Sequence, residues 1–316
     1  MGRPNVILLS RRQLLQGSLL FAVPVLAQKS DPTFTTSVKV VSLLASVKNK
    51  KGELNPDLAQ TDFQVLEDGR VQAIRYFARQ SDLPLTIGLL IDTSMSQDKV
   101  LDSERSACFR FLDQVLRPRQ DKVFITQFDS RIINRQELTD SYKDLNDSLT
   151  SVDTPSRSQL SNGIGTGTRI FDTVLGAAKT MQPLQGRKAL MILSDGEDND
   201  SDATLEAGVE AAIKADTLLY SILFSDATFY GGFGGGGGAH NLERLASETG
   251  GGFFAVSKKQ SIDQIFDRIQ TELRSQYSIG YVSDKPVDIP EFRKLQLNVD
   301  DKGFTVQTRT RYWATQ

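Results

Sequence analysis

The fold is decided by one stretch of sequence, in which an apolar run leads directly into acidic and hydroxyl residues: Leu85-Thr86-Ile87-Gly88-Leu89-Leu90-Ile91-Asp92-Thr93-Ser94-Met95-Ser96. A nearly continuous apolar run of this length is typical of a strand that is buried on both faces, as in a parallel sheet covered by helices. The polar residues begin where this run ends. The sequence therefore predicts a buried strand whose carboxyl end carries several oxygen-bearing side chains.

Similar apolar runs recur through the middle of the chain and alternate with helical patterns. The further strand candidates are Lys122–Phe128, Ala189–Leu193, Leu218–Phe224 and Gly252–Val256, and Arg131–Leu138 follows the first of these closely enough to be its hairpin partner. A helix is indicated by apolar residues at helical spacing: Ile262, Ile265, Phe266, Ile269 and Leu273. Strands that alternate with helices predict an α/β fold, in which a doubly wound, mostly parallel, Rossmann-like sheet is covered on both faces.

Short alternating patterns flank this domain on both sides. Before it, Phe63 and Val65 lie on one strand face, and Glu67-Asp68-Gly69-Arg70 is a hairpin signal. After it, alternating rows are Tyr277, Ile279 and Tyr281; Leu295, Leu297 and Val299; Phe304 and Val306. Because so few strands cannot bury a core alone, we expect the two flanks to pair with each other. The α/β domain, residues 83–274, is then inserted into a small antiparallel β unit formed by residues 28–82 and 275–316.

The first 27 residues have the layout of an export signal. The run Ser10-Arg11-Arg12-Gln13-Leu14-Leu15 precedes a short apolar stretch, which ends in the small-residue site Val25-Leu26-Ala27. The paired arginines resemble a twin-arginine signal. The apolar stretch is about half of the roughly 20 residues that a membrane-spanning helix needs, although retention as an uncleaved anchor is the alternative. We therefore expect an exported protein, located in the periplasm, on the cell surface or outside the cell, with no transmembrane helix after signal removal.

Composition excludes several classes of protein. Apolar residues make up 39% and charged residues 24%, which is ordinary for a soluble globular chain. The signal segment carries three arginines and no acid, so its removal leaves 34 basic against 39 acidic side chains. Such a balance gives no electrostatic footprint for nucleic acid. The single cysteine, Cys108, lies in an apolar helical pattern, and it excludes both an intramolecular disulfide and a cysteine-based zinc site.

Three polar fragments carry the chemistry. Asp92, Ser94 and Ser96 follow the first strand, Thr168 ends the glycine-rich loop Gly163-Ile164-Gly165-Thr166-Gly167, and Asp195 lies in a Ser-Asp-Gly turn after the third strand. Taken singly, the hydroxyls suit helix caps and Asp195-Gly196 suits a turn. Loops at the carboxyl ends of parallel strands converge, however, so all three fragments can meet at one place. Two carboxylates and three hydroxyls are hard oxygen donors, which suit Mg²⁺, Mn²⁺ or Ca²⁺ rather than zinc.

This combination of D-x-S-x-S, a threonine in a glycine-rich loop and an aspartate in an S-D-G turn resembles the metal-ion-dependent adhesion site of von Willebrand factor type A domains. The resemblance covers the central zone and implies a six-stranded sheet with one antiparallel edge. It also implies that Ser94, Ser96 and Thr168 contact the metal through their hydroxyls, while Asp92 and Asp195 act through water. The flanks, which contain Phe63-x-Val65-x-Glu67-Asp68-Gly69 and Leu273-Arg274-Ser275-Gln276-Tyr277, are similar to exported bacterial proteins that embed this domain between short β segments.

The expected function is divalent-metal-dependent protein–protein interaction or adhesion, in which an Asp or Glu of a partner protein completes the coordination of Mg²⁺. Mn²⁺ and Ca²⁺ remain alternatives as the ion, and no residue is assigned a catalytic role. A periplasmic assembly factor or scaffold that uses the same site is an alternative function. A Mg²⁺-dependent phosphotransfer enzyme with Asp92 as nucleophile is a weaker one, because the three loops contain no lysine before Lys99. The sequence carries no signal for oligomeric state.

Two further segments are given no role in binding. The run from Gly231 to Gly238 does not link a strand tightly to a helix, as a dinucleotide loop must, so we interpret it as a flexible surface loop. His240, at its end, is the only histidine and makes a poor metal site alone. The acidic residues from Glu197 to Asp202 indicate a solvated loop, with a second calcium site as the alternative.

Overall fold

The computed structural model describes residues 40–80, 83–163, 166–224, 236–287, 289–300 and 303–315. The export signal and its cleavage site, predicted within residues 1–27, lie outside these ranges. No helix among the described residues combines the length and apolar character needed to cross a membrane.

A six-stranded sheet forms the centre of the α/β domain, in the order β10-β9-β8-β5-β6-β7. Its strands are β5 (Leu85–Asp92), β6 (Lys122–Phe128), β7 (Ile132–Thr139), β8 (Arg187–Ser194), β9 (Leu218–Leu223) and β10 (Phe253–Ala255). Neighbouring strands run parallel except at one edge, where β7 pairs antiparallel with β6. The predicted fold class is confirmed, and each strand differs from its predicted bounds by two residues or fewer at either end.

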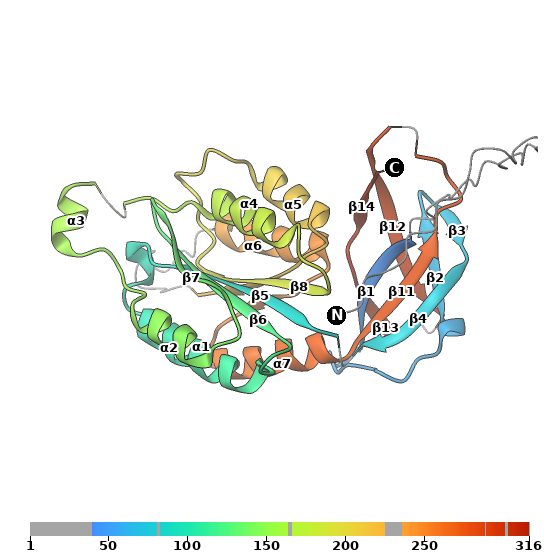
Figure 1. Cartoon of the computed structure of the whole chain (residues 1–316), viewed down its shortest axis with the longest axis horizontal. Helices are drawn as coiled ribbons and strands as arrows, with labels where there is room; N and C mark the ends of the chain where they lie inside the picture. The colour runs from blue at the N-terminus through green and yellow to red at the C-terminus, as the bar shows by residue number, and fades with distance from the viewer. Residues whose placement is uncertain are drawn as a thin grey trace, which may run out of the picture. The chain divides into compact units, whose positions relative to one another are not determined.

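Helices cover both faces of this sheet (Figure 1). One face packs against α1 (Leu101–Val115), α2 (Tyr142–Thr150) and α7 (Ile262–Arg274), and the other against α4 (Ile170–Met181), α5 (Leu205–Lys214) and α6 (Gly236–Thr249). The alternation within β5 shows why, because Leu89 and Ile91 belong to the first core and Leu90 to the second. The remaining helical segments are short: η2 (Met95–Gln97) and α3 (Arg157–Ser161). Burial on both faces explains the continuous apolar runs in the sequence.

The flanking segments form two four-stranded antiparallel sheets that share a core. One has the order β13-β1-β11-β4 and the other β14-β12-β2-β3. The bounds are β1 (Val40–Asn49), η1 (Gln60–Asp62), β2 (Phe63–Glu67), β3 (Arg70–Gln72), β4 (Ile74–Gln80), β11 (Gln276–Val282), β12 (Glu291–Val299), β13 (Phe304–Gln307) and β14 (Arg311–Ala314). β11 pairs with β1 and β4, and β12 pairs with β2. The expectation that the α/β domain is inserted between strands that pair with each other is therefore confirmed.

The hairpin predicted at Glu67–Arg70 joins β2 to β3. Glu67 pairs with Arg70, while Asp68 and Gly69 between them both have positive φ, at 47° and 80°. Two consecutive positive φ angles are the signature of the tight turn that matches strand twist, which explains the Asp-Gly pair. The turn sets the register that places Phe63 and Val65 in the shared core.

A buried ion pair lies inside this β unit. Arg293 Nη1 donates to Glu67 Oε1 at 3.1 Å, and both side chains are fully buried. Glu67 Oε2 also accepts hydrogen bonds from the hydroxyls of Tyr281, at 2.6 Å, and Tyr312, at 3.0 Å. Buried charges are tolerated when their remaining hydrogen-bonding capacity is satisfied, as it is here. This explains why an acid occurs in the otherwise apolar face of β2.

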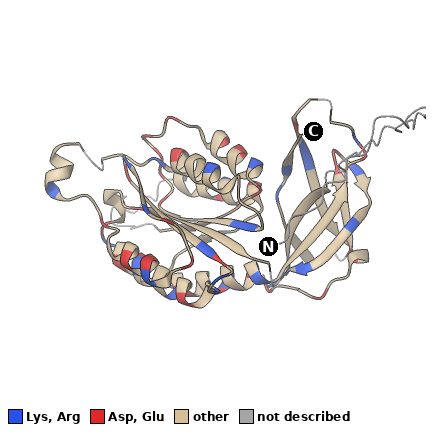
Figure 2. Ribbon diagram, in the orientation of Figure 1, with Lys and Arg blue, Asp and Glu red and all other residues tan. Residues whose placement is uncertain are grey.

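Charged side chains of both signs are interspersed over the helices (Figure 2). Several form pairs one helical turn apart, such as Lys143 with Asp147 and Lys214 with Glu210. Such exposed pairs each contribute at most about 1 kcal/mol, so apolar burial in the three cores supplies most of the stability.

Candidate metal centre

The candidate site begins at the junction of β5 and β8. The chain passes from β5 to β6 on one side of the sheet and later returns to β8 on the other side, so the strand order reverses at β5. Ile91 of β5 lies opposite Leu193 of β8. Asp92 and Ser194 therefore end adjacent parallel strands, and Asp195 follows immediately. Such a reversal point is where ligands bind in open α/β sheets.

The Asp92 loop is held by its own side chains. The backbone N–H of Ser94 donates to Asp92 Oδ1 at 2.9 Å, and the hydroxyl oxygens of Ser94 and Ser96 lie 3.1 Å apart. Asp92 and Ser94 are buried, and Ser96 is half-buried. The three predicted ligands of this fragment therefore lie together, with Ser96 nearest to solvent.

Asp92 lies in an environment that disfavours its own charge. Burial, followed by the neighbouring Asp195 carboxylate, raises the pKa of Asp92 to about 7. The hydroxyl of Ser194 donates to Asp92 Oδ2 at 2.5 Å and offsets part of this rise. Two neighbouring carboxylates repel each other unless one is protonated or a cation lies between them. The arrangement is therefore suited to a bound cation.

Thr168 is anchored from both sides. Its backbone N–H donates to Asn199 Oδ1 at 2.9 Å, and its carbonyl accepts from the N–H of Asn199 at 3.2 Å. The next residue, Arg169, donates its N–H to the carbonyl of Asp129, directly after β6. Because β6 pairs with β5 and Asn199 lies four residues beyond Asp195, these bonds bring the buried Thr168 to the same end of the sheet as both aspartates.

The helix-cap alternative for the hydroxyl residues is wrong. The N-cap residue of α1 is Val100 and that of α4 is Arg169, and neither residue makes a capping bond with its own side chain. Ser94 precedes η2 but makes no capping bond. The first turn of α4 is instead bonded by Asp198, which accepts the N–H of Phe171 at 2.9 Å. The hydroxyls of the predicted site therefore do not serve helix ends.

The Asp195-Gly196 turn contacts the start of α6. Gly196 has a φ of 83°, and a Cβ added there would lie 2.2 Å from the carbonyl oxygen of Gly238. A Cβ on Gly238 would lie 2.4 Å from the carbonyl oxygen of Asp195. Glu197 Oε1 also accepts the N–H of Gly238 at 3.0 Å. Only glycine allows two backbones to approach so closely.

The prediction of a surface loop across the whole glycine run is therefore wrong for its last residues. Gly236–Gly238 form the first turn of α6, because packing against the Asp195 turn overrides the low helix propensity of glycine. Residues 231–235 lie outside the described part of the chain. His240 lies in α6, with its side chain exposed.

The acidic segment after the turn is held by contacts within the protein. Arg169 forms ion pairs with Asp202 at 2.7 Å and Asp172 at 3.4 Å. The carboxylate of Asp172 in turn accepts the backbone N–H groups of Asp202 and Ala203. Asp200 and Asp202 are exposed, as expected of a solvated loop, while Asp198 caps α4 and Asp202 pairs with Arg169.

The donors present fit a hard cation. In the part of the chain that the structure describes, no group of three or more His, Cys, Asp and Glu side chains can hold a metal ion. Hydroxyl groups of the Asp92 loop lie beside Asp92, so the donors here are oxygen atoms alone, which suit a hard cation. The sequence argument missed Ser194 and Asn199, which position Asp92 and Thr168; strand register is the signal that predicts the position of Ser194.

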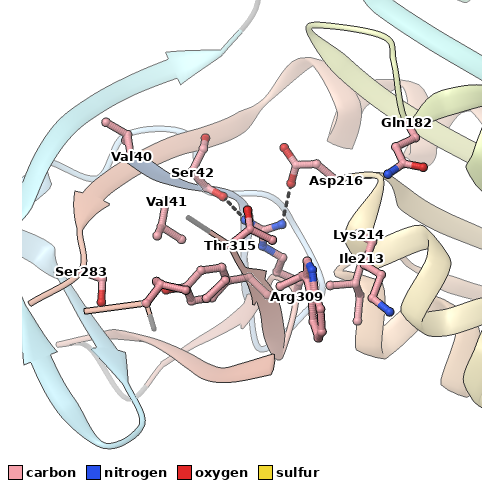
Figure 3. Close-up of a pocket in the computed structure, with 14 residues that line it drawn as sticks. Val40, Val41, Ser42, Gln182, Ile213, Lys214, Asp216, Ser283, Arg309 and Thr315 are labelled. Carbon is pink, nitrogen blue, oxygen red and sulfur yellow. Dashed lines mark hydrogen bonds and ion pairs between the residues drawn. The ribbon is translucent and has the colours of Figure 1, made fainter. Parts of the chain in front are cut away.

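The protein also has a cavity of about 420 Å³, whose lining residues are drawn in Figure 3. It is lined by residues near both ends of the described chain and by the end of α5, including Val40, Trp313 and Lys214. Arg309 beside it forms an ion pair with Asp216 at 2.6 Å and donates to the carbonyl of Ser42. None of the five predicted metal residues lines the cavity.

Comparison with known families identifies the α/β domain. The profile of the von Willebrand factor type A domain matches residues 86–268, which is more than half of the chain. The chain belongs to the von Willebrand factor type A (VWA) domain family. The resemblance inferred from the D-x-S-x-S, threonine and S-D-G fragments is thus confirmed. A comparison with curated proteins returned no significant match.

Several solved structures are similar to the VWA chain. BatB from Bacteroides thetaiotaomicron is 16% identical, covers 60% of this chain with 97% of its own and gives a TM-score of 0.46. The domain of the type V pili tip protein Mfa5 from Porphyromonas gingivalis is 12% identical, with coverages of 62% and 96% and a TM-score of 0.46. Proximal thread matrix protein 1 from the mussel byssus, in a form with a zinc-occupied MIDAS motif, is 17% identical, with coverages of 66% and 50% and a TM-score of 0.49.

Proposed function

We propose that this VWA protein binds other proteins through a divalent cation held by Asp92, Ser94, Ser96, Thr168 and Asp195, with an Asp or Glu side chain of the partner completing the coordination. One observation carries the proposal. The carboxylates of Asp92 and Asp195 repel each other at the point where the strand order reverses, and the hydroxyl groups of the nearby residues make no helix-capping bond. Mg²⁺ is the proposed ion, with Mn²⁺ and Ca²⁺ as alternatives.

Each side chain has a defined part in this proposal. Ser94, Ser96 and Thr168 present neutral oxygen atoms, while Asp92 and Asp195 accept hydrogen bonds from metal-bound water. A cation held largely by neutral ligands keeps enough charge to attract a carboxylate strongly. Met95 lies between Ser94 and Ser96 in the sequence and is 48% exposed, so it provides an apolar contact for the same partner.

The place of action in this proposal is outside the cytoplasm. This location is inferred from the segment Ser10–Leu15, which resembles a twin-arginine export signal. Display on the cell surface favours an adhesin, and residence in the periplasm favours an assembly factor that contacts clients transiently. Fractionation of cells that express the full chain separates these two forms of the proposal.

Metal binding is tested directly by titration calorimetry of the purified protein with Mg²⁺ and Mn²⁺. We expect Asp92→Ala and Thr168→Ala to retain the fold by circular dichroism and to lose metal binding. Thr166→Ala is the matched control, because this threonine of the same loop is exposed and its hydroxyl donates to the carbonyl of Gly163. Unchanged metal affinity in both site variants would overturn the assignment.

Partner binding is tested by affinity capture from an extract of exported proteins, with and without a chelator. Captured proteins that depend on both the ion and Thr168 support the interaction role. The phosphotransfer alternative predicts instead that the protein releases phosphate from a simple phosphoester and that Asp92→Asn abolishes this release. We expect no such turnover.

A further inference from the structure

The core-facing stripe of α1 contains an acid. Buried residues recur along this helix at spacings of three and four, as Leu101, Glu104, Ala107, Cys108, Phe111, Leu112 and Val115. All but Glu104 are apolar, and they pack against the sheet. Positions on the core-facing side of a helix are normally apolar, but Glu104 occupies one of them. Its side chain is completely buried.

The carboxyl group of Glu104 has no hydrogen-bond partner among the described residues. Both carboxyl oxygens, Oε1 and Oε2, are shielded from solvent and unpaired. Burying a carboxylate without partners costs several kcal/mol in a folded protein. A natural sequence retains such a group where an ion or a bound water satisfies it.

The position of Glu104 points to the metal centre. Its carboxyl group interacts electrostatically with Asp92 and Asp195, the two acids of the site. Gln97, at the end of the Asp92 loop, is also fully buried and leaves its Oε1 unpaired, while its Nε2 lies 3.5 Å from Ser96 Oγ. Gln97 and Glu104 therefore each leave buried side-chain oxygen unpaired among the described residues, Gln97 beside Ser96 and Glu104 within electrostatic reach of Asp92 and Asp195.

Direct ligation by Glu104 does not fit the geometry. Within the described ranges, Asp92, Asp195 and Glu104 do not form a group of acids able to hold one ion together. The remaining position is the outer sphere, where a carboxyl group hydrogen-bonds water on the ion rather than the ion itself. Groups of this kind orient the inner ligands and tune metal affinity.

We propose that Glu104 is an outer-sphere positioning residue of the metal centre, whose carboxyl oxygens hydrogen-bond water held between the cation and α1. The inference rests on the proposed metal site. Burial, together with Asp92 and Asp195, raises the pKa of Glu104 well above its ordinary value, which is consistent with an acid that needs a nearby positive charge to ionise. Gln97 is the neutral partner in the same water layer.

The test compares Glu104→Gln with Asp113→Asn, which removes a charge from an exposed position of the same helix. We expect Glu104→Gln to weaken the Kd for Mg²⁺ at least tenfold, as outer-sphere substitutions typically do, and Asp113→Asn to leave it unchanged. Water-proton relaxation of the Mn²⁺ complex gives a second readout that a purely structural role does not move. We expect Glu104→Gln to alter this relaxation, because Glu104 holds water on the ion.

Two outcomes separate the inference from the function on which it rests. Absence of Mg²⁺ and Mn²⁺ binding by the unaltered protein overturns the proposed function itself. Normal binding by the unaltered protein, with a Glu104→Gln variant that matches Asp113→Asn in Kd and relaxation, overturns only the role of Glu104. Glu104→Leu, whose apolar side chain suits the stripe, repeats the measurement if the glutamine variant is unstable.

Discussion

Ser194 donates its hydroxyl hydrogen to Asp92 Oδ2 at 2.5 Å, across the boundary between the two strands at which the sheet reverses its order. The same hydroxyl accepts the N–H of Gly196 at 3.0 Å. One small side chain thus fixes the orientation of Asp92 and shapes the turn that carries Asp195. The serine of the S-D-G fragment is therefore a positioning residue that connects both acids.

Replacing Ser194 with Ala should weaken metal binding without unfolding the protein. Loss of the hydrogen bond frees Asp92 to rotate and raises its pKa further, and both effects oppose cation binding. We expect a Mg²⁺ affinity at pH 7 that is about tenfold to a hundredfold lower, as measured by calorimetry. Ser221→Ala is the matched control, since the hydroxyl of this buried serine on β9 has no hydrogen-bond partner in the described part of the chain. Equal affinities in the two variants would contradict the role of Ser194.

The metal-free protein should lose stability as the pH rises through about 7. The pKa of Asp92 is raised from 3.8 to about 7 by burial and by Asp195, so the folded state binds a proton that the unfolded chain releases above about 4. The stabilisation is therefore complete below pH 4 and is lost as the pH passes 7. Melting temperatures between pH 5 and 8 in the presence of a chelator check this trend, and Asp92→Asn should flatten it.

Metal affinity should have the opposite pH dependence. A cation competes with the proton on Asp92, so Mg²⁺ binding weakens about tenfold for each pH unit below 7. Calorimetry at pH 6, 7 and 8 measures the change, and buffers of different ionisation enthalpy report the proton released. An affinity that stays constant from pH 6 to 8 would show that Asp92 does not take part.

The sequence predicted the strands of the α/β domain well because their apolar runs are long and nearly continuous. It also placed Asp92 and Asp195 at one end of the sheet, because strand order in a doubly wound fold brings carboxyl ends together. Glu104 was not predicted, since a single acid in a helical stripe has no local signature. Gly236–Gly238 were mistaken for loop, because their helical state depends on a tertiary contact with Gly196.

Gly238, in the first turn of α6, should be essential for metal binding. A Cβ on Gly238 would lie 2.4 Å from the carbonyl oxygen of Asp195, so Gly238→Ala must displace the turn that carries this acid. We expect metal affinity to fall at least tenfold. Gly237→Ala is the neighbouring control, because its Cβ would meet only Glu197 at 3.8 Å, an ordinary contact. That variant should bind metal normally and gain up to about 1 kcal/mol of stability from its higher helix propensity.

The buried ion pair of the β unit should be costly to break from one side. Arg293→Met leaves Glu67 charged and buried, with only the hydroxyl groups around it. We expect the free energy of unfolding to fall by about 3–5 kcal/mol, as measured by urea denaturation. Adding Glu67→Leu removes the unpaired buried charge, so the double variant should recover a large part of the lost free energy of unfolding.

Lys143→Met is the control, because it breaks an exposed pair with Asp147. It should change the free energy of unfolding by less than about 0.5 kcal/mol. If the single and double variants are equally unstable, packing around Arg293 rather than its charge determines the stability of the β unit.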